Sequence, residues 1–214
     1  MNNWLLYIIT IFLMLTKDSL TQENKAFKFE GAIGLNASQI SGDGTHGFAQ
    51  FGTQFGGYVY YQKNELFQYS LGLLFSQKGA RKYQTADNIS TYRLRTNYVD
   101  LPIEFQYAYR DFYFTIGPSI NFLINYTEGT EFGPTETNRT FSFIEFSGVG
   151  SIGYRIKDNW NIRLYYQNSI LPVRKHDGTF YFPPTNSILV ETYHKLYNLG
   201  QYHSLFSLQV RYTI

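Results

Sequence analysis

Apolar and polar residues alternate with a period of two in eight stretches of the chain. Because successive side chains of a β-strand point to opposite faces, such alternation predicts strands with one apolar face and one polar face. The clearest stretch is 112–125, where Phe112, Phe114 and Ile116 share one face while Thr115 and Ser119 share the other. The eight predicted strands cover residues 27–38, 51–61, 67–77, 92–107, 112–125, 143–156, 160–169 and 202–214.

The connections between these strands alternate strictly in length. Three are short, covering residues 62–66, 108–111 and 157–159, and four are long, covering residues 39–50, 78–91, 126–142 and 170–201. In an up-and-down arrangement all short turns fall at one end and all long loops at the other, as in outer-membrane barrels. The sequence therefore predicts an all-β fold, an eight-stranded antiparallel up-and-down transmembrane β-barrel with short periplasmic turns and long extracellular loops.

A soluble lipocalin-like barrel is the alternative architecture, because its strands alternate as well. Such a carrier encloses an apolar interior, whereas the polar faces of the predicted strands carry charged residues such as Glu104 and Arg211. The charged inner faces therefore favour the membrane barrel.

Two prolines, Pro102 and Pro118, fall inside predicted strands. Proline has no backbone N–H and cannot donate a hydrogen bond to a neighbouring strand. We therefore expect a β-bulge at each of these two positions.

Residues 4–15 form an apolar run interrupted only by Thr10. The run is shorter than the roughly 20 residues that a transmembrane helix needs, and it has the length of the hydrophobic region of a signal peptide. Small side chains at Ser19 and Thr21 favour cleavage near Thr21. We therefore expect a cleaved signal peptide over residues 1–21 and an outer-membrane barrel domain over residues 22–214. A buried N-terminal helix or a membrane anchor is the alternative for the apolar run.

Aromatic residues make up 19% of the chain although hydrophobic residues make up only 43%. This combination suits amphipathic strands with aromatic girdles at the membrane interfaces. The net charge of +2, without any Lys/Arg run interleaved with aromatics, argues against a nucleic-acid partner. The chain has no cysteine, which excludes a disulfide scaffold, thiol catalysis and thiolate metal sites.

Four segments carry a family resemblance. They are residues 34–43 (GLNASQISGD) followed by Gly47 and Phe48, residues 75–80 (FSQKGA), residues 98–107 (YVDLPIEFQY) and the strand that leads to Gly117. Together, and in this order, they resemble the PorT-like family of bacterial outer-membrane β-barrel proteins. The resemblance implies an eight-stranded barrel in the outer membrane of a Gram-negative bacterium. The namesake of the family is associated with type IX protein secretion.

Five charged residues fall on the polar faces of the predicted strands, toward the end with the short turns: Glu30, Glu104, Arg155, Arg163 and Arg211. An eight-stranded barrel is just wide enough for its own side chains to fill. Charges buried in so narrow a space must pair, because an unpaired one costs several kcal/mol. The fourth and eighth strands lie opposite each other, so we expect Glu104 and Arg211 to meet across the bore. The prediction is a luminal plug of ion pairs, with a narrow gated pore as the alternative.

His203 invites comparison with outer-membrane hydrolases, but its neighbour Ser204 points to the opposite face of the strand. Ser207 shares the face of His203, yet the sequence places no evident acid to orient the imidazole. We therefore predict no catalytic residues and no enzymatic activity, with an acyl hydrolase acting on lipid as the alternative. Candidate metal ligands occur only in pairs or in acidic loops, so no metal and no cofactor are expected.

The last long loop contains Phe180, Tyr181 and Phe182, followed by two prolines. Exposed aromatics stiffened by adjacent prolines suit recognition of a protein or glycan surface, whereas a lid over the barrel mouth is the alternative. The predicted function is a non-enzymatic integral outer-membrane protein with a structural, accessory or surface-interaction role, linked through the resemblance to protein secretion. Expected partners are outer-membrane lipid and a protein bound by the extracellular loops. We expect no nucleic-acid partner and a monomeric barrel.

Overall fold

The computed structural model describes residues 27–41, 47–62, 66–84, 91–130, 132–134, 140–175 and 200–214. The expected signal peptide, residues 1–21, and the loop residues Phe180, Tyr181 and Phe182 lie outside the described residues. Over the described ranges, no helix has the length and apolar character needed to cross a membrane.

Eight long strands in the described part of the chain form one antiparallel sheet that closes on itself. Each strand pairs with the next barrel strand, and β1 pairs with β10 from Glu30↔Thr213 to Ser41↔Tyr202. The predicted all-β, eight-stranded up-and-down barrel is thereby confirmed. The barrel strands are β1 (Phe27–Ser41), β2 (Gln50–Gln62), β3 (Phe67–Lys82), β4 (Tyr92–Tyr109), β5 (Phe112–Thr130), β7 (Ile144–Lys157), β8 (Trp160–Ser169) and β10 (Gly200–Thr213).

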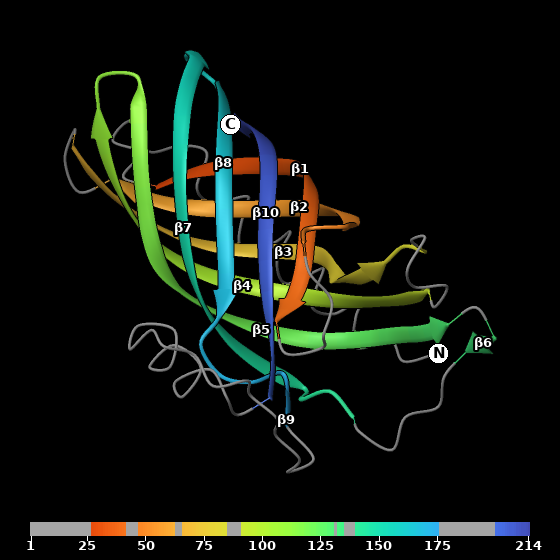
Figure 1. Ribbon diagram of the computed structural model, residues 1–214. Helices are drawn as coiled ribbons and strands as arrows, with labels where there is room; N and C mark the ends of the chain where they lie inside the picture. Colours follow the sequence, from red (N-terminus) through yellow and green to blue (C-terminus); the bar gives the residue numbers. More distant parts are fainter. Residues whose placement is uncertain are drawn as a thin grey trace, which may run out of the picture.

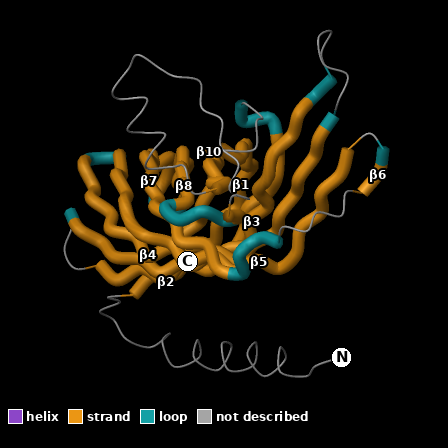
Figure 2. Tube along the Cα trace, turned by 60° about the horizontal axis from the view of Figure 1, so that its bottom comes forward, coloured by secondary structure: helices purple, strands orange, loops and turns teal. Residues whose placement is uncertain are grey.

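The barrel has one end with short turns and one end with long connections, as the sequence predicts. The strands are steeply tilted, so the wall of β7, β8 and β10 crosses the wall of β2, β3 and β4 behind it (Figure 1). The short-turn end lies where β2 is followed by β3, β4 by β5 and β7 by β8, and the long-loop end lies at the opposite ends of these strands. Two short strands, β6 (Gly133–Pro134) and β9 (Arg174–Lys175), pair with β5 and β10 at the long-loop end, β6 at its outer margin (Figure 2).

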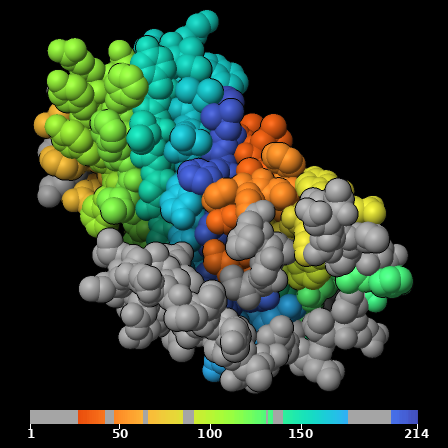
Figure 3. Space-filling view, in the orientation of Figure 1, coloured from red at the N-terminus to blue at the C-terminus, as the bar shows by residue number. Residues whose placement is uncertain are grey.

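The outward positions of the barrel strands are mainly apolar and the inward positions mainly polar. Leu35 and Ile116 each expose 70% of their surface, whereas the inward-facing Asn36 and Ser119 are buried. In the space-filling view, the side chains of β7, β8 and β10 form a continuous wall (Figure 3). An exposed apolar surface of this extent is unfavourable in water, and it suits a wall covered by lipid chains.

Aromatic residues encircle the short-turn end. Each of the adjacent strand pairs β1/β2, β3/β4, β5/β7 and β8/β10 has touching aromatic rings at its last residues there, with ring centroids 4.9–5.3 Å apart. Every pair joins a tyrosine to a phenylalanine or a tryptophan, and these side chains place a polar tip beside an apolar body. Such a girdle marks the edge of the apolar band of an outer-membrane barrel. The four pairs are Phe27–Tyr61, Phe67–Tyr107, Phe112–Tyr154 and Trp160–Tyr212.

The two prolines within strands do not shift the register, so the predicted bulges are wrong. The β3–β4 register is the same on both sides of Pro102, and the β5–β7 register runs unchanged through Pro118. Neighbouring glycines leave room for the rings, since a Cβ at Gly72 would lie 2.8 Å from Cγ of Pro102, and Pro118 pairs with Gly148. The β4–β5 register shifts instead beside Asn97.

Strands β3 and β5 end at Lys82 and Thr130, five residues beyond the predicted ends at Gln77 and Asn125. The prediction failed there because polar residues occupy both faces of these extensions, although the backbone pairing continues. The ends of β3, β4 and β5 thus extend past the neighbouring strands at the long-loop end (Figure 1).

Candidate functional site

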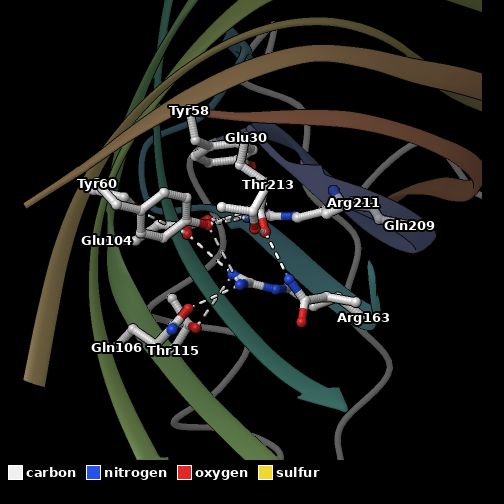
Figure 4. Close-up of polar contacts among 12 residues, drawn as sticks. Glu30, Tyr58, Tyr60, Glu104, Gln106, Thr115, Arg163, Gln209, Arg211 and Thr213 are labelled. Atoms are coloured by element: carbon white, nitrogen blue, oxygen red, sulfur yellow. Dashed lines mark hydrogen bonds and ion pairs between the residues drawn. The ribbon is translucent and has the colours of Figure 1, made fainter. Parts of the chain in front are cut away.

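Two arginines and two glutamates meet inside the barrel near the short-turn end, and we call this group the arginine cluster. Glu30, Glu104, Arg163 and Arg211 project inward from β1, β4, β8 and β10 and are buried. The two guanidinium groups point from neighbouring strands toward Glu104 and Tyr60 (Figure 4). The cluster therefore joins walls of the barrel that face each other across the bore.

Arg211 binds both glutamates of the arginine cluster. Its Nη1 lies 3.4 Å from Oε2 of Glu30, and its Nη2 lies 3.6 Å from Oε1 of Glu104. The same two nitrogens donate to the hydroxyls of Tyr60 and Tyr58, each at 2.8 Å. The guanidinium also lies over the Tyr58 ring, with Cζ 3.8 Å from the centroid. The planar donor set of an arginine suits this simultaneous binding, which a lysine could not reproduce.

Arg163 connects the cluster to β4 and β5. Its Nη1 lies 3.2 Å from Oε2 of Glu104 and donates to Oγ1 of Thr115 at 3.3 Å. Its Nη2 donates to Oε1 of Gln106 at 2.8 Å and to the Tyr60 hydroxyl at 3.4 Å. Glu104 is thus held by both arginines, from both of its oxygens.

The charges of the arginine cluster balance, and its polar atoms are hydrogen-bonded except Oε1 of Glu104, which has only its ion pair with Arg211, and Nε of Arg163. Glu30 accepts from the Tyr60 hydroxyl at 2.6 Å and from Nδ2 of Asn161 at 2.9 Å. Two buried cations face two buried carboxylates, so the net charge is zero. A folded protein tolerates buried ions only when good geometry and hydrogen bonds compensate for the hydration that the ions lose. The cluster meets that condition.

Arg155 is not part of the arginine cluster, although the sequence analysis grouped it with the other four. It is exposed at the short-turn end, and its Nε donates to the Tyr113 hydroxyl at 2.6 Å. Tyr113 in turn donates to Asn161, which donates to Glu30. The β7–β8 register shifts next to Arg155, and because its side chain is exposed it needs no carboxylate partner.

A second group of charges lies further along the lumen, toward the long-loop end, and we call it the lysine cluster. Nζ of Lys78 lies 3.1 Å from Oδ1 of Asp100 and 3.5 Å from Oε1 of Glu145. Nδ1 of His203 lies 3.0 Å from Oε2 of Glu145, whose Oε1 accepts from Ser169 at 2.9 Å. All of these side chains are buried. The sequence analysis missed this cluster, although alternation along β4 places Asp100 on the same polar face as Glu104.

His203 does have an acid beside it, contrary to the expectation from sequence. Nδ1 of His203 lies 3.0 Å from Oε2 of Glu145, so this carboxylate orients the imidazole. The nearest hydroxyl to the other ring nitrogen is that of Thr96, at 3.5 Å, and Thr96 is fully buried. Ser204 faces outward and donates to Asn168. Ser207 lies about 13 Å further along the strand by the rise of roughly 3.3 Å per residue, so it is not paired with His203.

An apolar layer closes the lumen at the long-loop end. Phe141 and Val173, from the connections that flank β7 and β8, pack inside the mouth against three strand residues. The amide of Ser142 donates to the carbonyl of Val173 at 2.7 Å, so the two inserted segments hold each other. The buried members of the layer are Ile40, Ala80, Leu94, Phe141 and Val173.

A buried ion pair covers this apolar layer. Arg174 donates from both terminal nitrogens to Glu128, at 3.3 and 2.7 Å, and its guanidinium lies 3.9 Å from the centroid of Phe141. Tyr92 donates to the same carboxylate at 2.8 Å. The paired forks of arginine and carboxylate fix the position of the inserted segment. The lumen thus contains three closing layers in series.

Among the described residues no group of three or more histidine, aspartate or glutamate side chains could hold a metal ion. The cavity at the short-turn end, lined by Glu30, Tyr60, Arg155 and Arg163 among others, measures about 70 Å³. It has room for a few water molecules and not for a cofactor.

A family of outer-membrane barrels matches most of this chain. Residues 18–173 match the family described as outer membrane protein beta-barrel domain. Solved structures of similar fold include Neisserial surface protein A, with 9% identity, a TM-score of 0.49 and coverage of 86% of this chain and 96% of that chain. Ail, the attachment invasion locus protein of Yersinia pestis, has 11% identity, a TM-score of 0.46 and coverage of 87% and 98%. CarO of Acinetobacter baumannii has 13% identity, a TM-score of 0.44 and coverage of 85% and 96%. The chain matches no curated protein.

Proposed function

Because this chain belongs to the outer membrane protein beta-barrel domain family, which matches residues 18–173, we propose that it is a non-enzymatic integral outer-membrane protein with an occluded barrel. In this role the barrel anchors and positions the long loops and carries no solute. The loops then provide a structural, accessory or surface-interaction function on the outside of the cell.

The membrane orientation follows from the two ends of the barrel. Outer-membrane barrels place short turns in the periplasm and long loops outside. Strand β5 carries outward apolar residues from Phe112 to Phe122. At about 3.3 Å per residue and a tilt of about 40°, this stretch rises roughly 25 Å along the barrel axis, which matches the apolar band of such barrels. We therefore assign the short-turn end to the periplasm.

The observation that carries the proposal is the arginine cluster, which links opposite walls through direct side-chain contacts. Arg211 on β10 reaches Glu104 on β4, and Arg163 on β8 reaches the same carboxylate. An ion crossing the bore would have to break these pairs and then pass the lysine cluster and the apolar layer. Eight strands enclose a bore that is just wide enough for its own side chains to fill.

The absence of catalysis is also proposed on geometric grounds. The arrangement of Glu145, His203 and Thr96 has the order of an acid, a base and a hydroxyl, but all three side chains are buried in the closed lumen. A substrate acyl group would have no path to them. We assign the three residues to the packing of the lysine cluster.

A partner in protein secretion is a further part of the proposal, supported by the PorT-like resemblance of residues 34–43, 75–80 and 98–107. Phe180, Tyr181 and Phe182 are the residues proposed to contact a protein partner, on the strength of their sequence. Outer-membrane lipid is the other proposed partner, and the closed ring of strands suits a monomer.

Electrical recording across a planar bilayer tests the occluded lumen. We expect the folded protein to produce no discrete conductance steps, because three closing layers stand in series. Folding is checked on the same sample by the shift in gel migration between unboiled and boiled protein. A lack of conductance from unfolded protein is then not mistaken for a closed lumen. Regular, reproducible steps from inserted protein would contradict the proposal and favour a narrow gated pore.

A further inference from the structure

The outward faces of the barrel strands carry a small group of arginines at the long-loop end. Over the described parts of the eight barrel strands, the charged side chains at outward positions in the long-loop half are Arg81 on β3 and Arg93 and Arg95 on β4. We call these three residues the outer arginine patch. The corresponding outward positions of β1, β2, β5, β7, β8 and β10 carry uncharged residues.

The outer arginine patch lies just beyond the apolar band. Along β4 the outward residues change from Val99 to Asn97 and then to Arg95 and Arg93. Asn97 donates to Oδ1 of the outward Asn125 on β5 at 2.6 Å, which forms a row of amides between the band and the arginines. At about 3.3 Å per residue and a tilt of about 40°, Arg95 stands roughly 10 Å above Val99. Arginine side chains at this height reach the headgroup layer, which adds about 5–7 Å to each side of the hydrocarbon core.

The patch lacks a carboxylate partner among the described residues, since none lies within 4.0 Å of its three guanidinium groups. Arg81 pairs directly with Arg93 across the β3–β4 ladder, an arrangement of like charges that is unfavourable by itself. The Nε of Arg95 is buried and has no hydrogen-bond partner. An anion bound between these side chains relieves the repulsion between their like charges.

A groove runs along the patch and leaves room for such an anion. Its volume is about 1310 Å³, and its lining includes Arg81, Arg93, Arg95, Thr127 and Gly129.

Glu128 lines the same groove, but Arg174 and Tyr92 hold its carboxylate on the inward side. The net charge that the groove presents at the outer arginine patch is therefore positive.

We propose that the outer arginine patch binds the phosphate groups of a phosphorylated glycolipid of the outer leaflet. This inference rests on the proposed membrane orientation, which puts the patch in that leaflet. Arginine guanidinium groups bind phosphate oxygens through paired, charge-assisted hydrogen bonds, so three of them suit a bisphosphorylated headgroup. The site fixes the depth and rotation of the barrel in the membrane on one side only, beside β3, β4 and β5.

Native mass spectrometry of the detergent-solubilised full chain, titrated with bisphosphorylated lipid A, tests the proposal. In the test variant Arg81, Arg93 and Arg95 are all replaced by Gln. In the matched control, Lys28, Arg110 and Lys157, exposed at the short-turn end, are replaced by Gln, so both variants lose three positive charges. Folding of each is verified by the gel shift on boiling.

We expect the patch variant to bind lipid A at least about tenfold more weakly than the unmodified protein, and the control to stay within about twofold. Each arginine near an anionic surface changes the binding affinity by roughly fivefold. Equal weakening in both variants, or no weakening in the patch variant, overturns the proposal.

A parallel titration with inorganic phosphate separates a lipid site from a general anion site. Retention of lipid A in the presence of millimolar phosphate supports a lipid site, and displacement by it, with weak lipid binding, overturns the lipid assignment. The conductance experiment is independent of this one. A conducting barrel that still binds lipid A through the patch refutes only the occluded lumen, whereas a silent barrel without patch-dependent binding refutes only the lipid site.

Discussion

Replacing Arg211 with methionine is expected to lower the free energy of unfolding by about 3–5 kcal/mol, the range for removing one partner of a buried ion pair. The substitution leaves Glu30 without its cation and deprives Glu104 of one of two. It also removes the hydrogen bonds that the hydroxyls of Tyr58 and Tyr60 accept from the guanidinium group. The measurement is a guanidinium titration of the barrel folded into phosphatidylcholine vesicles, followed by the fluorescence of Trp160 at the short-turn rim.

The matched control is the same substitution at Arg155, which is exposed and lies outside the arginine cluster. It loses one hydrogen bond to Tyr113, so we expect a change of about 1 kcal/mol or less. Adding Glu104→Gln to Arg211→Met is expected to restore part of the loss, because it removes the excess negative charge. Equal losses at Arg211 and Arg155 would show that the luminal ion pairs do not support the fold.

Replacing Ile116 with arginine is expected to cost about 2–4 kcal/mol, as for a charge on the lipid-facing midplane of an outer-membrane barrel. Ile116 is 70% exposed near the middle of the outward apolar row of β5. In water, the same exposed position would accept arginine at little or no cost. The titration in vesicles described for Arg211 measures the difference.

Asn125→Arg is the control for this substitution, because Asn125 lies on the same strand, faces outward and stands above the apolar band. A charge near the interface costs about 0–1 kcal/mol. A cost that depends on depth, large at Ile116 and small at Asn125, is therefore the expected result. The same small effect at both positions would mean that lipid does not cover the middle of β5.

The architecture was readable from the sequence because one physical rule controls it along the whole chain. Lipid outside and polar groups inside force a period of two, and Phe112 to Asn121 display it without interruption. The meeting of Glu104 and Arg211 was predictable for a related reason. Their faces follow from alternation, and the fourth and eighth strands of a closed ring of eight lie opposite each other.

The lysine cluster was not predictable in the same way. Which inward residues meet depends on the stagger of strands round the barrel, which alternation does not encode. Glu145 sits at the start of β7, whose glycines at 148, 150 and 153 blur the pattern, and Lys78 fell in a predicted loop. Predicting the contact between Glu145 and His203 requires both the register of the paired strands and their stagger around the barrel.

The closure of the barrel mouth could not be predicted from the sequence, for another reason. Phe141 and Val173 lie in connections, where no periodicity indicates whether a side chain faces water or the lumen. The extension of β3 that carries Arg81 was missed because both of its faces carry polar residues outside the apolar band. Sequence alternation describes the part of this barrel inside the membrane better than the part above it.

The most direct test of the lipid-facing wall is the accessibility of spin labels in vesicles. The chain has no cysteine, so single cysteines can be introduced for labelling at Leu35, Leu71, Ile116 and Leu208, with Asn125 above the band as reference. We expect the first four labels to be accessible to oxygen, which dissolves in lipid, and protected from a water-soluble nickel chelate, with the opposite order at Asn125. Labels shielded from both reagents, as in a protein core, or open to nickel, as in a dissolved protein, would contradict the membrane barrel.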